Sequence, residues 1–314
     1  MKKSIKLFSL LLLSSVIILS SCKKKKEEEE QLKQDEATLQ TENESQSKDQ
    51  SQVQTETNNA FDDANSAFSG TSAGKSTNAL SICGAAVDTS SIAAKIIFIN
   101  YDGTTTCTGY KKSGKIKVQL ISGTSWRNAG ATVQLTYLDY KVTKIATDKS
   151  IVINGTQNVT KQNAIDWITF LTSGTGSVSY KTRANNMSIT FDEGTTRTWS
   201  AAHTSSYSVA SGVVTASHSG DTTITGVSSV SHWGTNRFGK TFTTAITSSI
   251  VSNNTCGWWK PVSGVVSHSV NTKSFSTTFG VASDGVPVST GCAYGFKVDW
   301  TGVEGTAKQA IVSY

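Results

Sequence analysis

The hexapeptide KIKVQL, residues 115–120, decides the fold class, because it alternates lysine or glutamine with branched apolar residues. Successive side chains of a strand point to opposite faces, so Ile116, Val118 and Leu120 are expected to face a core while the polar residues face water. This pattern is typical of antiparallel sheets with one solvated side. The fold around the hexapeptide should therefore consist of half-buried strands.

The same period of two recurs along the chain toward the C-terminus. Four further sets of apolar residues each occupy alternate positions, so the side chains within a set are expected to point to the same, inward face. The sets are Val133, Leu135, Tyr137; Met187, Ile189, Phe191; Phe275, Phe279; and Tyr294, Phe296, Val298, Trp300. Tyr140 and Val142 have the opposite parity to Tyr137, which predicts a β-bulge near Leu138 and Asp139. The residues 192–194, Asp-Glu-Gly, end one set and predict a hairpin turn.

No helix-length segments separate these strands, which argues against parallel βαβ units. We expect an all-β fold, a large antiparallel meander-type sheet or sandwich, with one short N-terminal helix. Ala60, Phe61, Ala64 and Phe68 have helical spacing and place that helix at residues 59–68. Residues 164–171 fit either a helical turn or a buried strand. A faint repeat, Thr-Cys-Thr-Gly at 106–109 and Thr-Cys-Gly at 255–257, leaves open whether 60–314 is one domain or two similar halves.

Residues 1–21 have the organisation of a secretory signal peptide. Three lysines precede an apolar run from Leu7 to Leu19. That run is shorter than the roughly 20 residues that span a bilayer. The following Leu19-Ser20-Ser21-Cys22 resembles the lipobox of bacterial lipoproteins. The resemblance implies cleavage before Cys22, diacylglycerol on its thiol, a fatty acyl chain such as palmitate on its amine, and a membrane as partner.

Residues 22–59 are charged and polar, beginning with four lysines and four glutamates after Cys22. Apart from Leu32, Leu39 and Val53, almost nothing in this segment is suited to packing, which predicts a disordered tether. A helix over residues 27–41 is the alternative, because Glu, Gln, Lys and Leu favour helix. It would lack a continuous apolar stripe to bury.

Four cysteines remain besides Cys22, an even number in a chain expected to be exported, where disulfides persist. We expect Cys83 to pair with Cys107 and Cys256 with Cys292, because these pairings close the shorter loops within each half. No two of the four are near enough in sequence for a typical zinc site.

Charge is divided unevenly along the chain. Residues 61–314 hold 20 Lys and Arg against 13 Asp and Glu, while residues 23–60 hold 6 against 10. A local lysine cluster, Lys111, Lys112, Lys115 and Lys117, is typical of the solvated face of an edge strand. No nucleic-acid recognition motif is present, so nucleic acid is not expected as a partner.

Candidate ligand-binding residues are few. Trp258 and Trp259 could present a stacking surface for a sugar ring, although core packing is the commoner role of such residues. Three histidines follow serines, namely His218, His232 and His268. They would bind a metal only if neighbouring strands aligned them, and no carboxylate accompanies them at ligand spacing. We therefore expect strand positions that face solvent or a polar sheet edge, and no metal site. Asp192 and Glu193 lie on a predicted turn, where nothing would desolvate their carboxyl groups and raise their pKa values, as an acid or base catalyst requires. The sequence shows no other catalytic constellation and no cofactor motif.

The combination of lipobox, polar segment, short helix and glycine-punctuated strands resembles a group of uncharacterised lipoproteins common in Bacteroidetes. The likeness is carried by Asp102-Gly103, residues 113–116 (SGKI), 153–156 (INGT), 197–199 (RTW) and 234–240 (GTNRFGK). It implies a lipid anchor in the outer membrane, with the periplasmic or surface orientation left open. We expect a non-enzymatic binding or structural module with a possible glycan or protein ligand. A hydrolase of envelope or extracellular polymers and a carbohydrate-binding protein are the alternatives.

Overall fold

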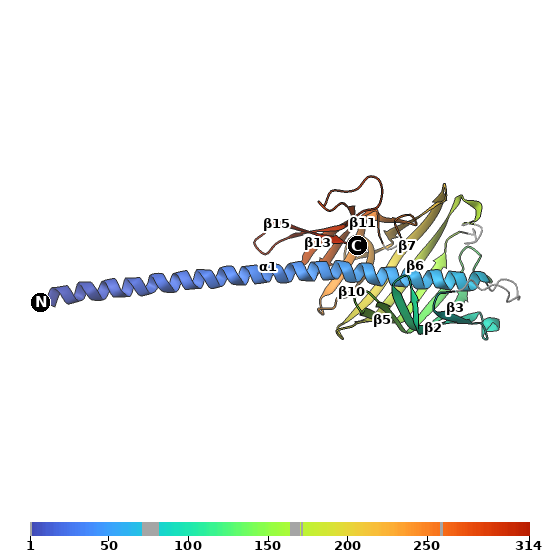
Figure 1. The fold of residues 1–314 in the computed structure, drawn as a ribbon, viewed down its shortest axis with the longest axis horizontal. Helices are drawn as coiled ribbons and strands as arrows, with labels where there is room; N and C mark the ends of the chain where they lie inside the picture. Colours follow the sequence, from blue (N-terminus) through green and yellow to red (C-terminus); the bar gives the residue numbers. More distant parts are fainter. Residues whose placement is uncertain (1, 71–81, 164–169, 171, 258–259) are drawn as a thin grey trace.

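The computed structural model describes residues 2–70, 82–163, 170, 172–257 and 260–314, with side chains from residue 26 onward except 68–70. A long helix, α1 (Lys2–Gly70), precedes an antiparallel sheet, and a short 3-10 helix (Ile92–Ala94) lies between β1 and β2 (Figure 1). The strands are β1 (Ala85–Asp88), β2 (Ile96–Cys107), β3 (Tyr110–Ser122), β4 (Thr132–Lys144), β5 (Lys149–Lys161), β6 (Gly176–Phe191), β7 (Thr196–Ala210), β8 (Val213–Gly220), β9 (Thr222–Ile224), β10 (Val227–Thr235), β11 (Thr241–Asn253), β12 (Ser263–Val270), β13 (Lys273–Val281), β14 (Gly295–Thr301) and β15 (Ala307–Ser313).

The sheet is a 15-stranded antiparallel meander, which confirms the expected all-β class and the meander alternative. Each strand pairs with the next from β1 to β7 and again from β10 to β15. The position between β7 and β11 is shared, because both β8 and β10 pair with these two strands. The short β9 pairs only with β10.

The inward-facing sets predicted from alternation are buried, with one exception. Ile116, Val118, Phe296 and Val298 are among the core residues. Tyr294 is 51% exposed, so its inward placement was wrong. It precedes the first residue of β14 and therefore lies outside the ladder that orients the other side chains.

The predicted β-bulge is present in β4. The register with β5 shifts between Tyr137 and Tyr140, and Asp139 has a φ of 50°. Opposite the bulge lies Gly114 of β3, where an added Cβ would come within 2.1 Å of the Asp139 carbonyl oxygen. A bulge inserts an extra residue, so Tyr140 and Val142 return to the buried face despite their shifted parity. The hairpin turn between β6 and β7 is also as predicted.

The prediction that residues 22–59 form a disordered tether was wrong, and the predicted helix at 59–68 was far too short. Helix α1 runs continuously through both segments and extends beyond the sheet at its N-terminal end (Figure 1). From Glu36 onward its side chains contact one face of the sheet, which we call the inner face. Leu32, before this point, is 40% exposed, whereas Leu39 is 7% exposed.

Helix α1 forms because of both local preference and tertiary packing. No glycine or proline interrupts residues 23–69, and side chains four apart interact, as in Gln31 with Asp35 and Gln40 with Glu44. The apolar stripe is interrupted, but its separate parts are buried. Leu39 joins a cluster from β11 to β14, and a second group joins a larger cluster from β2 to β7: Val53, Ala60, Phe61, Ala64 and Ala67.

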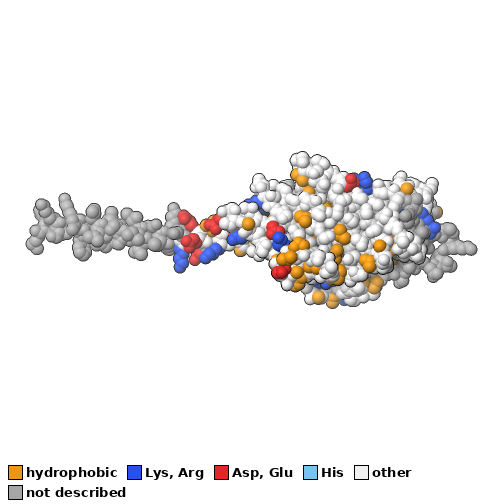
Figure 2. Space-filling model, turned by 90° about the horizontal axis from the view of Figure 1, so that it is seen from above, with side chains coloured by type: hydrophobic (Ala, Val, Ile, Leu, Met, Phe, Trp, Pro, Cys, Tyr) orange, Lys and Arg blue, Asp and Glu red, His pale blue; other side chains and the backbone are white. Residues whose placement is uncertain are grey.

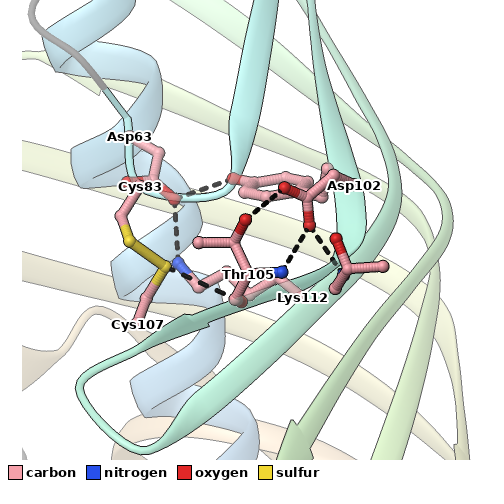
Figure 3. Close-up of a disulfide and its surroundings, with 8 residues drawn as sticks. Asp63, Cys83, Asp102, Thr105, Cys107 and Lys112 are labelled. Atoms are coloured by element: carbon pink, nitrogen blue, oxygen red, sulfur yellow. Dashed lines mark hydrogen bonds and ion pairs between the residues drawn. A yellow bond between two sulfur atoms is a disulfide. The ribbon is translucent and has the colours of Figure 1, made fainter.

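The C-terminal part of α1 is fastened by polar contacts near a disulfide (Figure 3). The Asp63 carboxylate accepts hydrogen bonds from the Tyr101 hydroxyl at 2.7 Å and from Lys112 at 2.9 Å. Nearby, the Cys83–Cys107 disulfide joins the chain before β1 to the end of β2. The second disulfide joins Cys256 to Cys292, so both expected pairings are confirmed.

The lysine cluster does not lie on an edge strand as expected. It belongs to β3, which pairs on both sides with β2 and β4. Lys112 instead reaches the inner face and binds α1.

Uncharged polar side chains and backbone dominate the molecular surface drawn in Figure 2. Among the described helical residues, none of the segments combines the length and apolarity needed to cross a bilayer.

Candidate functional site

The middle of the interface between α1 and the sheet is polar on both sides. Between the two apolar clusters, α1 buries Asn43, Gln46, Ser47, Asp49 and Gln50. The inner face opposes them with buried polar residues from β7 to β13: Arg197, His203, His218, His232, Thr244, His268 and Thr277. Burying so many polar groups is unfavourable unless each is hydrogen-bonded, so this region is the leading candidate for a functional site.

Two adjoining cavities lie here, and together we call them the histidine cleft. One has a volume of about 50 Å³ and the other about 180 Å³. They share four lining residues, namely Thr55, Asn58, His218 and Ser252. The smaller cavity extends toward His232 and His268, and the larger toward Asp62 and Tyr207.

Helix α1 lines the cleft with one polar stripe. Its members recur every three or four residues and therefore lie on one side of the helix: Ser47, Gln50, Ser51, Gln54, Thr55, Asn58, Asn59, Asp62 and Ser66. All are hydroxyl, amide or carboxyl side chains. Much of this wall therefore comes from the polar segment that was predicted to be a disordered tether.

His218, His232 and His268 form the opposite wall, and His203 lies beside them without lining either cavity. The His203 ring centroid lies 5.3 Å from that of His232 and 6.3 Å from that of His218, and Trp199 stacks on His232 at 5.1 Å. His218 Nδ1 shares a hydrogen bond with the Ser205 hydroxyl at 2.8 Å. His268 Nδ1 does so with Thr244 at 2.9 Å. Within the described part of the chain, both ring nitrogens of His203 and His232 and Nε2 of His268 have no hydrogen-bond partner.

Burial keeps these imidazoles neutral. It lowers the pKa of His218 to about 4 and the pKa of both His203 and His268 to about 3. It also lowers the pKa of His232 well below the ordinary value, with neighbouring His203 and Arg197 acting in the same direction. A neutral imidazole has one donor and one acceptor nitrogen. At pH 7 this wall therefore offers both hydrogen-bond donors and hydrogen-bond acceptors, and it carries no positive charge.

Arg197 lies behind the cleft and is 1% exposed. Its Nη2 donates to the Gln50 side-chain oxygen at 3.0 Å, and its guanidinium carbon lies 4.5 Å from the Phe242 ring centroid. Burial lowers the pKa of Arg197 to about 10, partly compensated by Asp49, so it stays charged at pH 7. Gln50 lines the smaller cavity, and its Nε2 has no partner among the described residues.

Asp62 is the ionisable carboxyl among the residues that line the cleft. Burial, followed by the neighbouring Asp63, raises the pKa of Asp62 to about 7. Its Oδ1 is shielded from solvent and has no partner in the described structure. Burial also raises the pKa of Tyr207 well above its ordinary value, so its hydroxyl stays protonated.

Ion pairs hold α1 on the N-terminal side of the cleft. Asp49, whose side chain is 4% exposed, accepts two hydrogen bonds from Arg237 at 2.6 and 2.7 Å. The Arg237 guanidinium also lies 3.9 Å from the Phe191 ring centroid and binds Glu193 at 2.6 Å. Glu42 pairs with Lys240 at 2.6 Å. These pairs match acidic side chains of the helix to basic side chains of the turn between β10 and β11.

The expectation that His218, His232 and His268 face solvent was wrong, because α1 covers the inner face on which they lie. The structure brings them together with His203, which sequence reasoning missed. Among the described residues no group of His, Cys, Asp and Glu is arranged to hold a metal ion. Trp258 and Trp259 and the Cys22 side chain lie outside the described residues.

The turn residues Asp192 and Glu193 play no part in the cleft. A side-chain hydrogen bond with Glu193 lowers the pKa of Asp192, and Glu193 binds Arg237. The missed half of the site is the α1 stripe, whose signal was the spacing of Ser47, Ser51, Thr55, Asp62 and Ser66.

Comparison with protein-family models, with curated proteins and with solved structures finds no match to this chain.

Proposed function

We propose that this protein is a lipid-anchored module of the bacterial cell envelope that binds a small polar ligand in the histidine cleft without chemical turnover. The observation that carries the binding role is the set of buried polar atoms without partners at the cleft, on Gln50, His232 and His268. Each such group costs about 1–3 kcal/mol unless something hydrogen-bonds it. A bound ligand supplies those partners.

The envelope location is supported by two independent features. The Cys22 lipobox pattern follows a charged and apolar signal-like segment. Two disulfides are formed, as is usual in oxidising compartments. This is the arrangement expected from the resemblance to uncharacterised Bacteroidetes lipoproteins.

The long helix gives the proposed anchor a mechanical role. Helix α1 runs without a break from Cys22 to Glu36, the first residue that binds the sheet through Trp300. At 1.5 Å per residue, these 14 steps hold the sheet roughly 20 Å from the acylated terminus. The segment is then a stiff spacer between a membrane and a binding domain.

Replacement of Cys22 by serine is expected to abolish incorporation of a fatty-acid label and to release the protein from membranes. The measurement is metabolic labelling with an alkyne-bearing palmitate in a bacterial host, followed by membrane fractionation. The double variant Cys83→Ser, Cys107→Ser is the matched control, since it removes the two cysteines of a disulfide and should retain the label. Absence of label on the unaltered protein would contradict the anchor.

The binding role is tested separately on the protein with ¹³C-labelled histidine side chains. Neutral sugars, amino acids and dipeptides are titrated while the imidazole signals of His218 and His232 are followed by NMR. We expect at least one of these classes to shift both signals in a saturable way. If none of them shifts either signal, the proposed binding function is wrong.

A second candidate function, hydrolysis of an envelope polymer, is favoured by one observation. Asp62 lies in the cleft with its pKa raised to about 7, as general acids of hydrolases require. Turnover of chromogenic glycosides that disappears in Asp62→Asn would favour this candidate. Turnover that is unchanged in Asp62→Asn, or absent altogether, favours the binding function.

A further inference from the structure

The charge of the residues that line the histidine cleft indicates which class of ligand it can bind. The residues lining both cavities include no lysine or arginine among those described. Arg197, the buried cation nearby, binds Gln50 and packs on Phe242, and its Nε and Nη1 have no partner among the described residues, but it does not line either cavity. An anionic ligand would therefore meet neutral imidazoles and the Asp62 carboxyl, and it could form no direct ion pair with a lining side chain to compensate its desolvation.

The lining side chains are also suited to one kind of hydrogen-bonding partner. Neutral imidazole, hydroxyl and carboxamide groups each both donate and accept. A hydroxyl group does the same, so it can bind either ring nitrogen of His232, Nε2 of His268 and the amide of Gln50, whichever tautomer is present. A ligand with several hydroxyl groups would satisfy these atoms together.

Apolar surface completes the site. Ile250, Val266 and Phe279 line the smaller cavity, and Tyr207 and Ala216 line the larger. The C–H faces of a pyranose pack against such side chains while its hydroxyl groups hydrogen-bond at the edge. The smaller cavity, of about 50 Å³, is lined by His232, His268 and Gln50 and takes a hydroxyl group of the ligand. The larger cavity, of about 180 Å³, far exceeds the volume of about 10–15 Å³ that one water needs, and it takes the sugar ring.

We propose that the histidine cleft binds a neutral saccharide, as a monosaccharide or as one residue of a glycan chain, between the polar stripe of α1 and the histidines of β8, β10 and β12. This proposal rests on the proposed function of the cleft as a binding site. It assigns sugar recognition to the helix–sheet interface rather than to Trp258 and Trp259.

The test uses the full chain and two threonine variants of the same helix. Glucose, galactose, N-acetylglucosamine and the anionic glucuronate are titrated by calorimetry and by the histidine NMR signals. We expect a neutral sugar to shift His218 and His232 and to bind at least about tenfold more tightly than glucuronate, because the cleft offers no cation to the carboxylate.

Thr55→Ala removes a hydroxyl that lines both cavities, and it should weaken sugar binding about fivefold or more. Thr41→Ala removes the hydroxyl of an exposed threonine on α1 and should leave affinity unchanged. Alanine favours helix, so neither variant should disturb α1. Asn58→Ala, at a second position shared by the cavities, should reproduce the effect of Thr55→Ala.

Three results would overturn the saccharide proposal. They are equal binding of glucuronate and neutral sugars, sugar binding that leaves both histidine signals in place, and equal losses of affinity in Thr55→Ala and Thr41→Ala. Saturable shifts of His218 and His232 by amino acids or dipeptides alone would also overturn it, while leaving the proposed binding function intact. Absence of shifts with every probe would overturn both.

Discussion

Lowering the pH from 7 to 5 is expected to reduce the free energy of unfolding by up to about 5 kcal/mol, which is comparable with the whole stability of many domains. All four histidines of the chain are buried, and burial lowers the pKa of each. In the unfolded chain their pKa values return to about 6.5. Between pH 6.5 and about 4 the unfolded state therefore binds more protons than the native state.

The sign follows from this difference in bound protons. Stability rises with pH wherever the unfolded state binds more protons, so the contribution of neutral burial is complete above pH 6.5 and is lost as the pH falls. At pH 5 each histidine loses about 2 kcal/mol of this contribution. Two buried carboxyl groups act in the opposite direction, because burial raises the pKa of Asp62 to about 7 and raises the pKa of Glu56. Asp62 offsets about 2 kcal/mol, and Glu56 adds to this offset.

Urea unfolding at several pH values measures the effect directly. In His203→Gln, the slope of unfolding free energy against pH between 5.5 and 4.5 should fall by about 1.4 kcal/mol per pH unit, because one proton is no longer taken up on unfolding. Asp62→Asn is the matched control with the opposite sign, and its slope should rise by a similar amount. A slope unchanged in His203→Gln would show that this histidine is not buried in its neutral form.

Replacement of Arg237 by alanine is expected to cost about 3–5 kcal/mol, because it leaves the Asp49 carboxylate buried without its partner. The native pair makes two hydrogen bonds at 2.6 and 2.7 Å, and the Asp49 side chain is only 4% exposed. The packing of the guanidinium on Phe191 is lost as well. Thermal or urea unfolding at pH 7 is the measurement.

Arg183→Ala is the control for Arg237→Ala. Arg183 pairs with Asp221 at 2.6 Å, but the two side chains are 46% and 26% exposed, so the expected loss is about 1 kcal/mol or less. Pairing Asp49→Asn with Arg237→Ala should recover part of the loss, because the buried charge is then absent. Similar losses in Arg237→Ala and Arg183→Ala would contradict the docking of α1 through Asp49.

The strands were predictable because alternation records burial directly. Residues 115–120 and 295–300 occupy strands whose one face lies in a core, and the parity change after Tyr137 located the bulge at Asp139. The disulfides followed from the short separations of Cys83 from Cys107 and of Cys256 from Cys292. These features depend on neighbours in sequence or in the adjacent strand.

Helix α1 was missed because its buried face is partly polar. Gln50 and Asp49 are buried by pairing with Arg197 and Arg237, which lie 147 and 188 residues away in sequence. A search for an apolar stripe cannot find a helix stabilised in this way. The histidines were placed in solvent for the same reason, since the element that covers them was assigned no structure.

The central claim is that helix α1 lies on the sheet and forms one wall of the histidine cleft. Hydrogen exchange along α1 tests this claim most directly. The backbone amides of residues 39–64 are expected to exchange far more slowly than those of residues 27–35, because only the former segment packs on the inner face. Equally fast exchange in both segments would show that α1 is undocked and that the cleft does not exist as described.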